Sequence, residues 1–420
     1  MNSVLQRWLR ICIFNFLLVA LAGLLLRYKI AFPLPQVNQK YLLHGHSHFA
    51  FAGWISQALM ILMIHVLDKH TNDFQSRRYQ PILIASQLSA LGMLLSFPVQ
   101  GYGPVAIFFS TCSIGVSWIF AWVYWLDLKR TTQPVKGKPW LIASLAFSLL
   151  SSLGVFAIAF IMSSGKTSQP AYLAAVYFYL HFQYNGWFIF ACTGIAISCF
   201  PGKAAATRTD RRVFLLWLTA CPFTYFLSAS WIQLPLFLRL LVPLAAIAQL
   251  AGWGTLLQKK MLSPLPDNPP FVRRLLWVVA FAMSVKLLLQ AASAIPSLNE
   301  MVFGYRSIVI AYLHLVMLGI VSLFIITTAL AEGGLPLHSG SRRSITALTA
   351  GIILNELVLM LQGAAGLVYA DFSSAPYWLL LAALVMLIAL GVLNLQLSRQ
   401  VKPAIDTPVF PECLKAQPVD

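Results

Sequence analysis

Charged residues are scarce in this sequence. Only 10% of the 420 residues are Asp, Glu, Lys or Arg, and 59% are hydrophobic, whereas a soluble domain carries roughly 25% charged residues. This deficit excludes an ordinary cytosolic enzyme and a disordered chain. The remaining charge is unbalanced, with 29 Lys and Arg against 12 Asp and Glu. In so apolar a chain the excess indicates positively charged cytoplasmic loops rather than nucleic-acid binding.

Cysteine motifs and a cleavable leader are also missing. The six cysteines form neither a CxxC nor a CxxCH pattern, so covalently attached c-type haem is unsupported, and the deficit of charge excludes a disulfide scaffold. The first apolar run, from about Ile11 to Leu26, is not followed by a small-residue cleavage site. We therefore expect it to be a retained helix.

Long apolar runs fill most of the chain. At roughly 20 residues per crossing, they predict an all-α membrane protein with twelve transmembrane segments. These form one domain over residues 1–400, followed by a loose cytoplasmic tail over 401–420. The loops are too short to fold as a separate domain. The predicted segments cover residues 10–28, 41–67, 81–99, 104–127, 139–163, 171–200, 212–230, 234–256, 274–295, 306–330, 344–368 and 376–397.

Positive charges predict the orientation of these segments. If the N-terminus is cytoplasmic, 22 of the 29 Lys and Arg lie on the cytoplasmic side, as is typical of membrane proteins. Both termini are then cytoplasmic, and even-numbered segments run from the outer face inward. We expect an integral protein of the bacterial cytoplasmic membrane. The seven exceptions are Arg27, Lys29, Lys40, Lys166, Arg239, Lys286 and Arg306.

Five of the eight histidines fall in even-numbered segments at similar depth, in the outer half of the predicted bilayer. Ionisable side chains within membrane segments are costly and usually functional. Neutral imidazole binds iron, copper and zinc, and a b-type haem held between two helices takes one histidine from each. The five are His44, His46 and His48 in the second segment, His181 in the sixth and His314 in the tenth.

The second segment can offer its histidines in two directions. His44 and His48 are four residues apart and share a helix face, whereas His46 projects to the opposite side. One of the three can therefore serve a haem and another a second metal. The alternatives are a zinc or proton-relay site or plain packing for these three, and a helix–helix hydrogen bond for His181 and His314.

Other polar side chains lie at the predicted depth of the histidines. Arg239, Lys286 and Arg306 can neutralise haem propionates or extend to the membrane interface. Glu356, which follows Asn355 in the eleventh segment, can relay protons or form a hydrogen bond with a neighbouring helix.

The sequence resembles the haem–copper oxidase subunit I superfamily, which includes the nitric oxide reductases. Twelve segments, cytoplasmic termini and histidines in segments two, six and ten carry this resemblance. His314 with the following Leu315 to Gly319 resembles the tenth-segment motif, and His44 with Gly53 resembles the second-segment motif of some branches. The resemblance implies an oxidase-like bundle in which His314 and one second-segment histidine hold a b-type haem. It also implies copper or another metal at His181, a quinol or cytochrome electron donor, and further membrane subunits.

The sequence departs from that superfamily at the catalytic centre. Tyr312 occupies the position of the histidine that binds the catalytic haem, and the seventh segment has no histidine to complete a copper site. We therefore expect an incomplete binuclear centre. The implied role is electron transfer or the handling of nitric oxide or oxygen and, if the protein is an enzyme, it is an oxidoreductase.

A second resemblance is to the NnrS family of haem- and copper-binding membrane proteins, which is linked to the nitric oxide response. His46-Ser47-His48, followed by an apolar run and Gly53, is similar to the His-x-His motif of that family. A rival hypothesis from another class is proton- or metal-coupled transport through the histidines, Lys286 and Glu356. The sequence shows no inverted repeat that would favour a transporter.

The predicted orientation can be tested by cysteine labelling of intact cells. Lys136→Cys and Arg208→Cys should stay unmodified by a membrane-impermeant maleimide, because they lie in predicted cytoplasmic loops, whereas Phe372→Cys should react. The wild-type chain provides the background. Labelling at 136 without labelling at 372 would overturn the orientation and place the five histidines in the inner half of the membrane.

Overall fold

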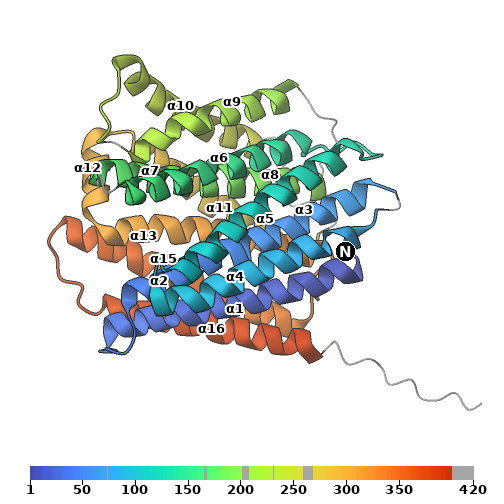
Figure 1. The fold of residues 1–420 in the computed structure, drawn as a ribbon, viewed down its shortest axis with the longest axis horizontal. Helices are drawn as coiled ribbons and strands as arrows, with labels where there is room; N and C mark the ends of the chain where they lie inside the picture. The colour runs from blue at the N-terminus through green and yellow to red at the C-terminus, as the bar shows by residue number, and fades with distance from the viewer. Residues whose placement is uncertain (73, 165–167, 201–207, 230, 259–267, 400–420) are drawn as a thin grey trace, which may run out of the picture.

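All regular elements of the computed structural model are helices, and the longest of them run side by side along the horizontal axis of Figure 1. The structure describes residues 1–72, 74–164, 168–200, 208–229, 231–258 and 268–399. Within these ranges, ten helical stretches are long and apolar enough to cross a membrane. The prediction of an all-α membrane protein is therefore confirmed. The predicted tail over 401–420 lies outside the described residues.

The described helices fall into three consecutive units with the same layout: a long helix, a second stretch interrupted by a π-helical turn, and two further helices. The first unit contains α1 (Ser3–Ala31), α2 (Gln39–Phe49), η1 (Ala50–Ser56), α3 (Gln57–His70), η2 (Ser76–Tyr79), α4 (Gln80–Gln100) and α5 (Pro104–Lys129). The second contains α6 (Lys138–Ser163), α7 (Gln169–His181), η3 (Phe182–Phe188), α8 (Ile189–Cys199), α9 (Arg208–Thr224), η4 (Tyr225–Ser228) and α10 (Leu236–Gln258). The third contains α11 (Pro270–Ala292), α12 (Pro296–Gly304), α13 (Arg306–His314), η5 (Leu315–Ser322), α14 (Leu323–Ala331), α15 (Ser339–Leu367) and α16 (Ala375–Arg399).

Each of the twelve predicted segments coincides with a described helical stretch, but two of them are not among the ten candidate spans. The sixth, α7–η3–α8, carries His181, Gln183 and Asn185 near its middle, which lowers its hydropathy. The seventh, α9, has only 17 residues. Polar groups within the sixth stretch and the shortness of α9 therefore separate these two from the rest.

The repetition is also present in the sequence. His48, His181 and His314 stand at the same interval of 133 residues (48 to 181 and 181 to 314), and each is followed five residues later by a glycine. Each of these histidines directly precedes, or lies two residues before, a π-helical turn. The helix layout and the spacing of these histidines are thus repeated three times in the same direction along the chain.

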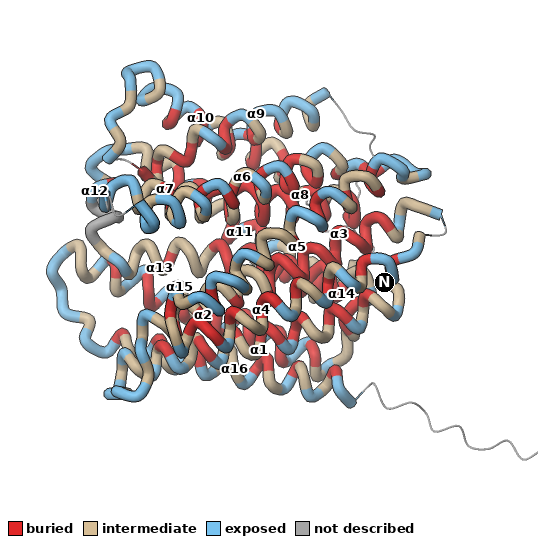
Figure 2. The backbone as a smooth tube through the Cα atoms, in the orientation of Figure 1, coloured by how far each residue is buried: buried red, intermediate tan, exposed pale blue. Residues whose placement is uncertain are grey.

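The three units form a closed ring around the second stretch of each unit. Helix α1 packs against α16, α5 against α6, and α10 against α11, so each unit contacts the other two. Inside the ring, α3, α8 and α14 pack against one another. Figure 2 shows the buried residues concentrated in this interior, and every residue of α3 from Gln57 to Leu67 is buried.

Hydrogen bonds join the π-helical turns at the centre of the ring. Trp54 of η1 donates its indole N–H to the hydroxyl of Ser322 in η5 at 2.8 Å, and Trp187 of η3 donates to Ser56 of η1 at 3.5 Å. By the 133-residue interval, the third equivalent pair is Ile320 and Ile189, which both line an apolar cavity. The contact between successive units is therefore polar twice and apolar once.

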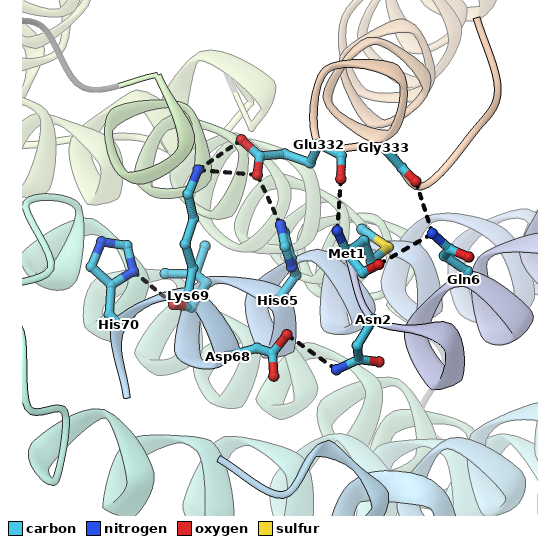
Figure 3. Close-up of polar contacts among 10 residues, drawn as sticks. Met1, Asn2, Gln6, His65, Asp68, Lys69, His70, Glu332 and Gly333 are labelled. Carbon is cyan, nitrogen blue, oxygen red and sulfur yellow. Dashed lines mark hydrogen bonds and ion pairs between the residues drawn. The ribbon is translucent and has the colours of Figure 1, made fainter. Parts of the chain in front are cut away.

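A polar cluster joins three of the helices at the end of the bundle that holds the N-terminus (Figure 3). The Glu332 carboxylate, just beyond α14, accepts hydrogen bonds from His65 Nε2 at 2.9 Å and from Lys69 Nζ at 3.0 Å. The ammonium group of Met1 donates to the Glu332 carbonyl at 2.9 Å. These contacts attach α1 and α3 to the end of α14.

Replacement of Glu332 tests this cluster. Burial raises the pKa of its carboxyl group, but the hydrogen bonds from His65 and Lys69 outweigh burial, so the net pKa lies below the ordinary value of 4.5. The stability that the carboxylate contributes is present above the ordinary pKa and is lost as pH falls through the lowered pKa. We expect Glu332→Gln to destabilise the detergent-solubilised protein at pH 7 by about 1–3 kcal/mol, the usual cost of leaving a buried polar group without its partner.

The measurement is the thermal unfolding midpoint between pH 3 and pH 8, followed by tryptophan fluorescence. Asp371→Asn, which changes an exposed carboxylate at the opposite end of the bundle, is the matched control and should not alter the midpoint. Equal midpoints for Glu332→Gln and wild type at pH 7 would show that the cluster does not stabilise the fold.

Candidate functional site

Three gaps separate the inner stretches of the three units, and each has a different lining. The first gap, between the second stretches of units one and two, contains a cavity of about 70 Å³. We call it the serine-lined cavity, because α5 and α6 contribute Ser110, Ser113, Ser117, Ser148, Ser151 and Ser152 to its wall. The second gap, between units two and three, contains an apolar cavity of about 70 Å³ lined by residues such as Trp253, Met283 and Phe324. The third gap, between units three and one, contains the histidine pair described next.

His46 on α2 and His314 on α13 lie in this third gap. Nδ1 of His46 is 3.1 Å from the carbonyl oxygen of Val19 on α1, and Nδ1 of His314 is 2.8 Å from the carbonyl oxygen of Ile310. The two rings are near enough to interact electrostatically. Both residues have intermediate exposure although they lie within the bundle.

The hydrogen bonds of the two rings determine which nitrogen is free. A backbone carbonyl oxygen only accepts, so Nδ1 must carry the proton in both His46 and His314. Nε2 of each neutral ring then presents its lone pair. A histidine that binds a metal is usually held in this way, with its other ring N–H donated to a carbonyl or carboxylate. The pair therefore has the donor chemistry of two axial ligands of a haem.

Arg27 on α1 is the positive charge of this site. It acts electrostatically on both His46 and His314, and Glu356 on α15 acts on it in turn. The Asn355 side chain donates a hydrogen bond to the Glu356 carboxyl group at 3.0 Å. In the sequence Arg27 is one of seven basic residues predicted to lie outside the cytoplasm, and no motif distinguishes it from the other six.

Gly23 provides the close approach between α1 and His46. A Cβ atom on this residue would stand 3.2 Å from Cε1 of His46, which is tighter than ordinary van der Waals contact. Gly23 and the Val19 carbonyl lie one helical turn apart on the same side of α1. Helix α1 thus both accepts the hydrogen bond of the His46 ring and leaves space for that ring.

The other two histidines of α2 face away from this pair. Nε2 of His48 is 3.2 Å from the Tyr102 hydroxyl, and the His48 ring stacks on Phe97 with 4.4 Å between ring centroids. The His44 ring lies edge-on to Tyr102 with 4.7 Å between centroids. The predicted division of the second segment into two faces is therefore present, with His46 on one face and His44 and His48 on the other.

His181 is fully buried, and both of its ring nitrogens have protein partners. Nε2 donates to the Cys221 carbonyl oxygen on α9 at 2.8 Å, and Nδ1 accepts from the Asn185 side chain at 3.1 Å. A metal at His181 would have to displace one of these hydrogen bonds. Among the described residues, no group of three or more His, Cys, Asp or Glu is arranged to hold a metal ion, so the structure does not assemble the five histidines into one site.

The three basic residues proposed to meet haem propionates have different surroundings. Arg239 on α10 and Arg306 at the start of α13 are exposed. Lys286 on α11 is only 2% exposed and donates a hydrogen bond to Gln290 at 2.5 Å. Its electrostatic neighbours are His181 and Cys221, which places it near the second gap rather than beside His46 and His314.

No protein-family model matches this chain, and no curated protein matches it.

A variant of His181 separates a structural role from a metal-binding role. We expect His181→Ala to lower the free energy of unfolding by about 2–4 kcal/mol, because it removes two buried hydrogen bonds and leaves a cavity. Asn185→Leu, which removes only one of these bonds, should cost less. The measurements are the thermal unfolding midpoint and the bound metal content of the purified protein. A His181→Ala protein with an unchanged midpoint and reduced copper would identify His181 as a metal ligand instead.

Proposed function

We propose that this chain is a b-type haem protein of the bacterial cytoplasmic membrane, with twelve spans, cytoplasmic termini and a bundle related to haem–copper oxidase subunit I. The haem would be held between His46 and His314. Its role would be electron transfer or the handling of nitric oxide or oxygen. The observation that carries the proposal is the matched anchoring of the two imidazoles, each of which donates Nδ1–H to a backbone carbonyl and leaves Nε2 free.

The charge around the histidine pair suits a haem, as do the donor atoms of the pair. Haem carries two propionates, and Arg is the side chain that best pairs with carboxylates inside proteins. Arg27 lies beside both histidines and is half-buried. Its side chain would offset the negative charge of a propionate, and Glu356 would limit the net positive charge when no haem is bound.

A haem with two imidazole ligands supplies one-electron chemistry and has no open coordination position. The residues of this chain would hold both rings in one tautomer and surround the site with helices from units one and three. An open position would require one imidazole to leave. Tyr312 and the absence of histidine from α9 support a centre that lacks the second catalytic metal.

The NnrS family remains an alternative identity, supported by the His46-Ser47-His48 motif. Proton- or metal-coupled transport is a second candidate function, and the serine-lined cavity favours it. That cavity brings His48, Gln183 and several hydroxyl groups together between apolar helices. Lys286, buried against Gln290 and near the second gap, is a further ionisable group within a candidate span.

Optical spectra of single variants test the haem proposal. Loss of one axial imidazole should release the haem or convert it from low spin to high spin. We therefore expect His314→Ala and His46→Ala each to lose the low-spin b-type spectrum, with the haem quantified as its pyridine haemochrome.

His70→Ala, whose ring lies at the opposite end of the second stretch, is the matched control and should keep the wild-type spectrum. An unchanged low-spin spectrum in His314→Ala would refute the haem assignment. Colourless wild-type protein, purified after expression with abundant haem, would favour transport.

A further inference from the structure

His44 and His48 form a second pair of imidazoles, one helical turn apart on the face of α2 opposite His46. Both rings lie against the same two aromatic side chains, Phe97 and Tyr102. The ring centroids of His44 are 6.1 and 4.7 Å from theirs, and those of His48 are 4.4 and 5.9 Å away. The pair therefore faces one shared space between α2, the end of α4 and the turn that follows it.

One nitrogen of this pair has no partner. Nε2 of His44 is buried and makes no hydrogen bond with any described residue. A buried polar atom without a partner costs about 1–3 kcal/mol. Nε2 of His48 contacts the Tyr102 hydroxyl at 3.2 Å. His48 and Tyr102 are thus in polar contact, the His44 ring lies against the same Tyr102 ring, and Nε2 of His44 is unsatisfied.

The turn after α4 positions the phenol. Gly101 has a φ of +59°, a conformation that side-chain-bearing residues rarely adopt. A Cβ atom on Gly101 would also stand only 2.6 Å from the ring of Tyr41. Both constraints require glycine, and the turn they allow directs Tyr102 back over the histidine pair.

We propose that His44, His48 and Tyr102 form a binding site for one late first-row divalent metal ion, with Cu²⁺ as the preferred ion. Two histidines four residues apart on one helix face can bind a single metal ion. Imidazole favours copper, nickel and zinc over magnesium and calcium, and Cu²⁺ binds most tightly among the divalent ions of this series. Water would complete the coordination shell. Lys40 acts electrostatically on His44, and its positive charge would weaken the binding of any cation there.

This site is independent of the haem proposal, because it uses the opposite face of α2. Titration of the purified full-length protein with Cu²⁺, followed by calorimetry and by electron paramagnetic resonance, tests it. We expect His44→Gln and His48→Gln each to weaken the tightest Cu²⁺ site at least tenfold, and the resonance of bound Cu²⁺ to show nitrogen hyperfine structure. Tyr102→Phe should weaken binding less, because it leaves both imidazoles in place.

His46→Ala and His70→Ala are the matched controls on the same stretch and should bind Cu²⁺ like wild type. The glutamine variants keep a polar side chain, so we expect them to fold. Their thermal unfolding midpoints check this. Wild-type Cu²⁺ affinity in the double variant His44→Gln/His48→Gln would overturn the proposal, as would loss of the tightest site in His46→Ala alone. Loss of the haem spectrum in His46→Ala with retained Cu²⁺ binding would support both sites separately.

Discussion

The three π-helical turns meet at the centre of the bundle, and the arrangement of the inner helices depends on their contacts. A π-helical turn is wider than an α-helical turn and makes i→i+5 hydrogen bonds, so it is rare and often occurs at functional sites. Trp54 and Trp187 use the widened turns to reach serine hydroxyls of the neighbouring unit. Because a buried indole N–H needs an acceptor, these two bonds specify how unit one meets units three and two. At the equivalent positions of units two and three stand Ile189 and Ile320, which both line the apolar cavity.

The same turns follow the histidines in each unit, and the surroundings then give each histidine a different environment. His48 faces an aromatic cluster and the serine-lined cavity, His181 is fully hydrogen-bonded within the protein, and His314 meets His46 across the third gap. A threefold backbone thus holds three unequal gaps, one polar, one apolar and one with two imidazoles and an arginine. The asymmetry arises from side chains, because the backbone layout is common to all three units.

Much of the fold was predictable from the sequence, since apolar length and loop charge locate the helical stretches without reference to tertiary contacts. The opposite faces of His44 and His46 also followed from helical periodicity. Other features were less accessible. In the sequence Arg27 is one of several exceptions to the charge pattern, and its role depends on the packing of α1 against α2 and on its electrostatic effect on His314. The occupied nitrogens of His181 depend on a carbonyl 40 residues away on α9. The equal spacing of His48, His181 and His314 is present in the sequence, as a direct rather than an inverted repeat.

The closed ring has a consequence for the order of the units along the chain. Helix α1 packs on α16 and α5 packs on α6, and the N-terminus and the end of α16 lie at the same end of the bundle (Figure 1). In the ring, therefore, each unit has the other two as neighbours, and no unit occupies an end position. Circular permutation at a boundary between units, with α16 joined to α1, would keep every contact between units and would change only where translation begins.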